Sequence, residues 1–202
     1  MGVTATENLR PAAEVPRRGA VVLDAAALTR CRRRIHLEHD PAASVGEQWL
    51  PDPIGEQRKA DAARHRAEVA QQLASAVEVG WVAVPAGPEA ERLQATVAAV
   101  EAGAELIWGA ALPPAEGRRG GAELLVRLPA GGYVPVIVVR HRISDRGEGA
   151  LTSSLDQPWP GMAAPDPQRR VRSQPRDLLR LAHLHRMLAA AGWAPAEQPG
   201  AS

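Results

Sequence analysis

The sequence predicts an α/β domain in which helices flank a central mixed β-sheet. Two strand-like runs, Glu123–Leu128 and Tyr133–Ile143, flank the turn residues Pro129–Gly132, and this pattern is typical of a β-hairpin. Segments on either side of the hairpin repeat apolar residues at helical spacing, most clearly in Glu56–Val79 and in a final helix that starts at Pro175. A hairpin-containing sheet between helices is therefore the expected architecture.

The length and composition of the chain indicate one folded domain. The 202 residues are 45% hydrophobic but only 3% aromatic, with no Phe, so we expect a core of Leu, Val, Ile and Ala with Trp as the large filler. Residues 1–19 are rich in Ala, Pro, Glu and Arg, which predicts a disordered leader. Residues 20–193 are expected to form the domain and residues 194–202 a disordered tail.

Charge and cysteine usage restrict the class of protein only weakly. The formal net charge is +1, which favours no particular partner, although all 24 basic residues except Lys59 are arginine. The lone Cys31 makes no internal disulfide and no cysteine zinc site, and we expect it to be a small buried residue. Residues 1–14 lack the apolar run of a signal peptide, and no stretch approaches the ~18 apolar residues of a membrane span. A cytoplasmic protein without a membrane partner is the expectation.

Two helices are predicted in the first third of the chain. Asp24 is a suitable N-cap for a helix over Ala25–Glu38, which Pro41 ends. Residues 41–57 are expected to be irregular, and the following helix is closed by Gly80. This long helix has two stripes, an alanine stripe expected to be buried and a polar stripe expected to be functional. The first stripe is Ala60, Ala63, Ala67, Ala70, Ala74 and Val77, and the second is Asp61, His65, Glu68 and Gln72.

The middle of the chain predicts a strand over Trp81–Val84, a helix over Pro88–Ala102 and a strand over Leu106–Trp108. Residues 113–121 are interpreted as a Pro/Gly/Arg loop and residues 145–170 as a second, longer loop. The helix at 88–102 places Leu93, Val97 and Val100 on one side. The final helix has Leu178, Leu181, His185 and Leu188 on one face and Arg176, Arg180, His183 and Met187 on another.

The second strand of the hairpin is unusual in two respects. Its continuous apolar run, Val136–Val139, favours a strand buried on both faces of a central sheet. Pro135 lacks an N–H group, so it requires a bulge or an unpaired edge at that point.

Four segments, in this order along the chain, are similar to the motifs of one known family. The Leu28–Glu38 segment resembles the family's opening Leu/Cys/basic motif, and Arg64–Val69 resembles a helical motif whose histidine reaches a metal ion. Gly120–Val126 with Gly132–Val136 resembles two core strands, and Arg176–Leu188 is similar to the family's "Gln-Leu-Ala-His" helix. Together the segments resemble the RecB-like nuclease family of the PD-(D/E)XK superfamily, and the resemblance implies a restriction-endonuclease-like core over nearly all of residues 21–193.

That resemblance further implies a metal-dependent DNA nuclease of repair or recombination. His65 and Glu123 would hold Mg²⁺ or Mn²⁺, hard cations that prefer oxygen ligands, and the cation would activate water for phosphodiester hydrolysis. An iron–sulfur cluster is not expected, because relatives that carry one use four cysteines. The family's strand carboxylate and lysine are replaced by Ile137 and Val139. The implied catalytic residues are therefore His65, Glu123, Arg140 and His141, with Asp145 or Glu148 as substitute ligands.

Clustered arginines predict contact with a phosphate backbone, because guanidinium groups bind phosphate in bidentate geometry. The candidates for DNA contact are Arg32, Arg33, Arg118, Arg119 and Arg180, the last of which replaces the family's glutamine. A solvated surface balanced by Asp and Glu is the alternative interpretation of these clusters.

Three functions stay open at this point. The first is the active nuclease, and the second is a catalytically silent relative that binds DNA or a partner protein. The third is an interaction protein unrelated to nucleases. The individual residues also have alternatives: His65 would be a surface histidine paired with Asp61 or Glu68, and Glu123 would be a strand carboxylate facing Arg127.

Overall fold

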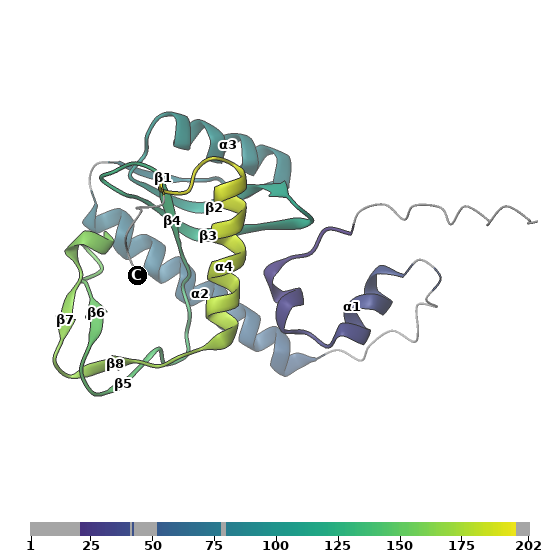
Figure 1. Ribbon diagram of the computed structural model, residues 1–202, viewed down its shortest axis with the longest axis horizontal. Helices are drawn as coiled ribbons and strands as arrows, with labels where there is room; N and C mark the ends of the chain where they lie inside the picture. Colours follow the sequence, from purple (N-terminus) through teal and green to yellow (C-terminus); the bar gives the residue numbers. More distant parts are fainter. Residues whose placement is uncertain (1–20, 41, 43–51, 78–79, 197–202) are drawn as a thin grey trace, which may run out of the picture.

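A four-stranded mixed sheet forms the centre of the computed structural model, which describes residues 21–40, 42, 52–77 and 80–196 (Figure 1). The strand order is β1-β2-β3-β4, with β1 parallel to β2 and the other pairs antiparallel. The strands are β1 (Trp81–Ala83), β2 (Leu106–Ala115), β3 (Arg118–Arg127) and β4 (Tyr133–Val136). The predicted α/β class, with a mixed sheet, a hairpin and flanking helices, is confirmed. The predicted leader lies outside the described residues, as do residues 197–202 of the predicted tail.

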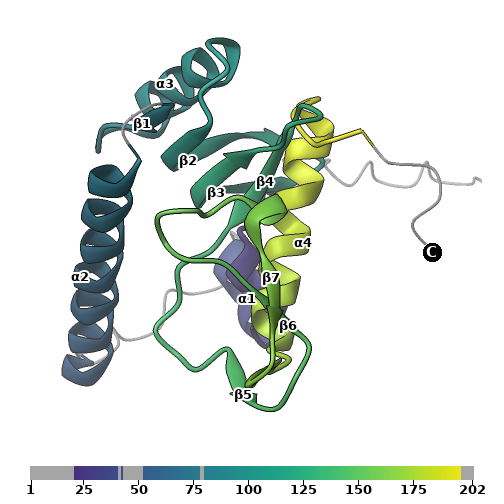
Figure 2. The same ribbon diagram turned by 90° about the vertical axis from the view of Figure 1, so that its left-hand side faces the viewer.

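Side chains alternate between two apolar clusters, one on each face of the sheet. On one face, Leu106, Leu124 and Val126 pack against the end of helix α2. On the other face, Ile107 and Leu125 pack with residues of helices α3 and α4. Figure 2 shows α2 and α4 on opposite sides of the sheet. The helices are α1 (Arg32–His39), α2 (Pro53–Ala76), α3 (Glu89–Glu101) and α4 (Pro175–Ala190).

Helix α3 connects the parallel strands β1 and β2, and its prediction over Pro88–Ala102 is confirmed to within a residue at each end. Its fully buried side chains are Thr96 and Ala99, whereas Leu93, Val97 and Val100 are half-buried. The Thr96 hydroxyl donates to the Arg92 carbonyl at 2.8 Å and accepts from the Ala111 amide at 3.0 Å. A buried hydroxyl with both bonds made fixes α3 against β2.

The expected loop at 113–121 is wrong, because β2 and β3 continue through it as a hairpin. The turn is at Glu116 and Gly117, both of which have positive φ (50° and 73°). Two consecutive prolines, Pro113 and Pro114, suggested a loop, but the pairing register shifts between Leu112 and Ala115. An irregularity of this kind accommodates residues that cannot donate to the ladder.

Strand β4 ends at Val136, so the predicted strand over Tyr133–Ile143 is correct only in its first part. β4 is an edge strand and not a central one, which explains Pro135: it lies opposite Leu125 with no further strand beyond it. Tyr133 is 3% exposed and donates a hydrogen bond to the Ala104 carbonyl at 2.8 Å. The following residues up to Val139 are half-buried and leave the sheet.

The predicted loop at 145–170 is also wrong, since this region forms two short antiparallel ladders. β5 (Ser144–Arg146) pairs with β8 (Arg169–Val171), and β6 (Ala150–Thr152) pairs with β7 (Ala164–Asp166). A 3-10 turn, η2 (Pro160–Met162), lies between β6 and β7. Residues 144–171 therefore make an arm that extends away from the main sheet, at the lower left of Figure 1.

Helix α2 begins at Pro53 with Asp52 as N-cap, so residues 53–57 are helical and not irregular as expected. The prediction that the alanine stripe is buried is wrong for Ala60, Ala63, Ala67 and Ala74, which are exposed, and correct for Val77, which is 7% exposed. Leu73 is the fully buried side chain, and it packs with Val69 and Val77. Larger side chains remove more apolar area from water, so the Val69–Leu73–Val77 face docks in preference to the alanine face.

The single helix expected over Ala25–Glu38 is two elements, a 3-10 helix η1 (Ala25–Thr29) and α1, with an extended break at Arg30. Asp24 caps η1 as predicted, accepting from the Ala27 amide at 3.1 Å. The prediction that Cys31 is buried is wrong: it is the exposed N-cap of α1. Backbone amides of Arg34 and Arg33 lower the pKa of its thiol.

Helix α4 has the predicted ends, with Pro175 in the first turn and Gly192 after the end at φ 72°. Its buried face is His183, Leu184, Met187 and Leu188, whereas Leu178 is 58% exposed and His185 is exposed. The buried residues therefore include members of both predicted faces, and the first half of α4 runs beside the arm and not over the sheet. Among the described helices, none is both long enough and apolar enough to cross a membrane.

Candidate nucleic-acid interface

An ion pair between β3 and α4 occupies the position where the sequence predicts a metal ligand. Glu123 Oε1 accepts from Arg180 Nη2 at 2.6 Å. The Glu123 side chain is 12% exposed and that of Arg180 is 34% exposed. The second oxygen, Oε2, is buried and has no hydrogen-bond partner among the described residues. Glu123 therefore faces Arg180 rather than Arg127, and it keeps one unused acceptor.

This pair lies in the wall of a cavity of about 680 Å³ between α2 and the sheet. Three of the lining side chains are arginines that come from three different helices. The lining residues are Ala63, Arg66, Ala67, Arg92, Trp108, Gly109, Gly121, Ala122, Glu123 and Arg180.

The arginines of the cavity differ in how firmly they are held. Arg92 Nη2 donates to the Gly109 carbonyl at 2.9 Å, and Gly109 itself has φ 70°. Arg180 is held by Glu123. Arg66 has no hydrogen bond or ion pair with another described residue. The cavity thus combines two fixed guanidinium groups with one that is available for a ligand.

Two further cavities, of about 610 and 230 Å³, meet the first one at Gly121. A Cβ atom at Gly121 would lie 2.2 Å from the Ala110 carbonyl oxygen, so only glycine fits there. The three cavities together are lined by six arginines and four carboxylates. The arginines are Arg30, Arg66, Arg92, Arg119, Arg176 and Arg180; the carboxylates are Asp24, Glu89, Glu123 and Asp177.

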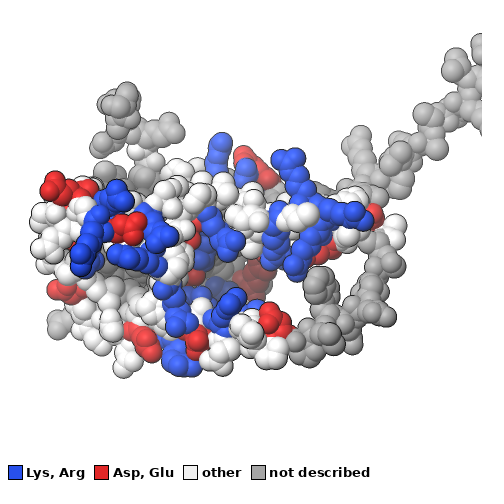
Figure 3. Space-filling view, turned by 90° about the horizontal axis from the view of Figure 1, so that it is seen from below, with Lys and Arg blue, Asp and Glu red and all other residues white. Residues whose placement is uncertain are grey.

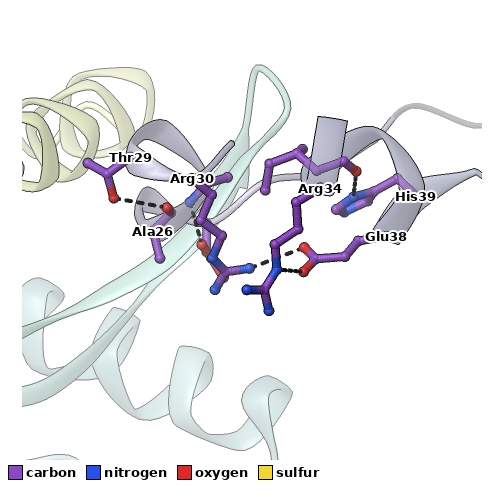
Figure 4. Close-up of polar contacts among 9 residues, drawn as sticks. Ala26, Thr29, Arg30, Arg34, Glu38 and His39 are labelled. Atoms are coloured by element: carbon purple, nitrogen blue, oxygen red, sulfur yellow. Dashed lines mark hydrogen bonds and ion pairs between the residues drawn. The ribbon is translucent and has the colours of Figure 1, made fainter. Parts of the chain in front are cut away.

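The wider surface repeats this excess of arginine. Figure 3 shows Lys and Arg gathered across the face seen from below, with acidic side chains scattered among them. Nε of Arg34 in α1 and Nη1 of Arg30, which precedes α1, contact the two oxygens of Glu38 at 2.7 and 3.2 Å (Figure 4). The hydrogen bond from Arg34 lowers the pKa of Glu38. Arg32 and Arg33 are exposed and have no such partner among the described residues.

Of the arginines predicted to contact DNA, the structure brings Arg119 and Arg180 to the cavities around Gly121. Arg118 is bound to Glu116 at 2.6 Å, beside the hairpin turn. Arg32 and Arg33 do not line these cavities, since they are on α1.

Two of the predicted catalytic residues have partners elsewhere. Arg140 Nη1 is 3.4 Å from Asp61 Oδ2, which links the segment after β4 to α2. His141 Nε2 is 2.6 Å from Asp177 Oδ2 at the beginning of α4. Neither residue lines the cavity that contains Glu123.

His65 is half-buried on α2, but it does not line that cavity either. It has no hydrogen bond or ion pair with another described residue, so neither suggested partner, Asp61 or Glu68, pairs with it, and Asp61 contacts Gln57, Arg64 and Arg140 instead. No group of three or more His, Cys, Asp or Glu side chains in the described ranges could hold a metal ion. Arg180 already supplies a positive charge beside Glu123, which is the one predicted metal ligand that lines this cavity.

Sequence reasoning missed the importance of Arg66 and Arg92. Arg66 lies next to His65 in the segment Arg64–Val69, which the sequence indicates as a motif with a metal-binding histidine. Arg92 lies in the first half of a correctly predicted helix, where nothing in the local pattern separates it from a surface arginine. Its role comes from the approach of α3 to Gly109, which is a tertiary contact.

Comparison with known proteins adds no relative of this chain: no family model matches it, and no curated protein or solved structure is significantly similar.

Proposed function

We propose that this protein binds DNA through the arginine-lined cavities around Gly121, as a catalytically silent domain of the RecB-like, restriction-endonuclease-like type. The observation that carries the proposal is the set of six arginines that converge there from η1–α1, α2, α3, β3 and α4, with the Arg180–Glu123 pair at their junction.

Phosphate is the ligand group that such a set recognises best. A guanidinium donates two parallel hydrogen bonds to phosphate oxygens and stays charged at every working pH. The six arginines exceed the four carboxylates of the lining, so the cavities favour an anion. Arg180 is oriented in advance by Glu123 and retains other N–H groups for a ligand.

The position of Arg180 favours DNA binding without hydrolysis of the DNA. A hydrolytic cation would have to share the Glu123 carboxylate with a guanidinium whose Nη2 atom is 2.6 Å from Oε1. Two positive charges on one carboxylate repel each other, and the repulsion is strongest where solvent is excluded. Phosphate binding needs only the positive charge that Arg180 provides.

Trp108 favours a single strand over a duplex. Trp108 is a lining residue of the cavity, and its ring centroid is 6.1 Å from that of Trp81. Bases stack on aromatic side chains in single-stranded complexes, whereas the bases of a duplex are already stacked. We therefore expect tighter binding to single-stranded than to double-stranded DNA.

The proposal is tested by fluorescence anisotropy with labelled single-stranded DNA in EDTA over a series of salt concentrations. Arg66→Ala is expected to weaken binding about 5- to 10-fold and to reduce the slope of log K against log salt by about 1. The matched control is Arg64→Ala, which removes an exposed arginine of the same helix that contacts Asp61 and does not line the cavity. Equal affinity of the two variants would contradict the assignment of DNA to this cavity.

Metal-dependent DNA hydrolysis is the second candidate, and one observation favours it: Glu123 Oε2 is buried without a donor, which leaves one carboxylate oxygen for a ligand. Titration calorimetry with Mn²⁺ on wild type, Glu123→Gln and His65→Ala tests this candidate. Binding that both substitutions abolish would support an active nuclease in repair or recombination. Absence of binding in wild type would refute it.

A further inference from the structure

Large apolar side chains are exposed together where the arm, residues 144–171, approaches the first half of α4. Ile143 is 57% exposed, Leu151 67%, Val171 70% and Leu178 58%. They come from the segment before β5, from β6, from β8 and from α4, so the chain brings them together by folding. A contiguous exposed apolar surface of this kind marks an interaction site.

These residues line a groove of about 380 Å³. Ile137, Ala150 and Leu181 lie deeper, and Ala150 is only 3% exposed. The walls are held in place: the Arg172 amide donates to the Ile143 carbonyl at 2.9 Å, and His141 binds Asp177 of α4 at 2.6 Å. The groove is therefore formed before any partner arrives.

The rim of the groove is positively charged. Arg169 and Arg172 are lining residues with side chains 62% and 50% exposed. Their contacts with Asp166 and Asp145 are long, at 3.5 and 3.8 Å. Arg146, which pairs in register with Arg169, is exposed and has no hydrogen bond or ion pair with another described residue. The carboxylate in the lining, Asp177, is occupied by His141.

We propose that this groove binds an acidic amphipathic helix of a partner protein, with apolar side chains inserted between β6, β8 and α4 and carboxylates facing Arg169 and Arg172. Apolar side chains from β6, β8 and α4 line the groove on several sides, which favours an amphipathic helix with one apolar face as its occupant. The apolar side chains inside the groove provide affinity, and the arginines at its rim select partners with acidic sequences.

Charge complementarity excludes the nearest alternatives. A second copy of this chain would bring one arginine rim against another. The first 20 residues of the chain contain three Arg and two Glu, so they do not complement the rim. DNA would satisfy the arginines, but it would leave the apolar side chains exposed. The groove shares only Asp177 with the DNA-binding cavities proposed above, and its other lining residues are different.

The test starts with selection of binders from a displayed library of helical peptides on the full chain. We expect enrichment of sequences with apolar residues at i, i+3 or i+4 and i+7 and with Asp or Glu between them. Failure to enrich any peptide, or enrichment without an acidic bias, would overturn the proposal.

Enriched peptides are then titrated against matched variants. Leu178→Ser is expected to weaken binding at least about tenfold, because a large apolar contact is lost. Leu179→Ser, an exposed neighbour on α4 that does not line the groove, should have no effect. Arg169→Ala should weaken binding about three- to tenfold, and mainly at low salt. Equal effects of Leu178→Ser and Leu179→Ser would refute the site, as would displacement of the peptide by DNA.

Sedimentation analysis of the unliganded chain decides between a partner helix and a second copy. A monomer at tens of micromolar is the expected result. A dimer that Leu178→Ser dissociates would show that the groove serves self-association, and it would overturn the proposal.

Discussion

Removal of Arg180 would leave Glu123 as an unpaired carboxylate in the wall of the cavity. Breaking a fully buried ion pair from one side costs about 3–5 kcal/mol. The Arg180 side chain is 34% exposed, so water can partly replace it beside Glu123, which is 12% exposed. The expected loss for Arg180→Ala is therefore about 2 kcal/mol of unfolding free energy, or about 4–8 °C in Tm for a protein of this size.

Urea unfolding followed by tryptophan fluorescence measures this loss, because Trp81 and Trp108 stack beside the sheet. Arg186→Ala is the control: it removes an exposed arginine from the same helix, and its effect should stay within about 0.5 kcal/mol. Arg180→Gln retains a donor for Glu123, so it should cost about half as much as Arg180→Ala.

A double variant separates the ion pair from other roles of Arg180. Glu123→Leu combined with Arg180→Leu removes both charges, so it should be more stable than Arg180→Ala alone. If Arg180→Ala costs no more than Arg186→Ala, the pair does not stabilise the fold, and the reasoning about its geometry is refuted.

Three further substitutions test the packing that positions the cavities, each by urea unfolding against wild type. Thr96→Val removes a buried hydroxyl and leaves the Ala111 amide without an acceptor, so we expect the free energy of unfolding to fall by about 2 kcal/mol. Thr96→Ser keeps the hydroxyl and should restore most of that stability. Tyr133→Phe removes a buried hydrogen bond and should cost about 1 kcal/mol at neutral pH. Burial raises the pKa of Tyr133 above that of the unfolded chain, so wild-type stability should be complete below pH about 10 and decline at higher pH, and Tyr133→Phe should flatten that decline. Gly121→Ala would place a Cβ atom 2.2 Å from a backbone oxygen and should cost more than about 2 kcal/mol, whereas Gly161→Ala, with no atom within 4 Å, should be neutral; equal stability of the two would contradict the described register of β2 and β3.

Local chemistry made much of the fold predictable from the sequence. Asp24 as a cap, the turn before Tyr133, and Pro175 with Gly192 at the ends of α4 are all governed by residues close in the chain. Helix α3 and strand β1 follow from hydrophobic periodicity in the same way. Signals of this kind do not depend on what the element packs against.

Tertiary context explains the errors. Pro113 and Pro114 favour a loop locally, but a register shift allows the strand to continue. The face that α2 buries was decided by Leu73 and its neighbours, because the alanines offer too little apolar area. Turn-rich residues 145–170 form ladders with each other, and pairings between short strands separated along the chain have no local signature.

The candidate site was predicted in part. Glu123 and Arg180 were both selected from the sequence, yet for different roles, and they are 57 positions apart. Neither charge pattern nor spacing indicates that two such residues neutralise each other. His65 and Glu123 were expected to share one metal ion, and the described structure does not bring His65 to the cavity.

The most direct test of the central proposal is to follow one labelled single-stranded DNA for both binding and integrity, in EDTA and in Mg²⁺ or Mn²⁺. If guanidinium groups take the place of a hydrolytic cation, wild type binds in EDTA at least as tightly as in Mg²⁺ or Mn²⁺, which compete for the phosphates, and the DNA is recovered at full length. Binding that requires the metal, or shortening of the DNA by wild type but not by Glu123→Gln, would contradict the account.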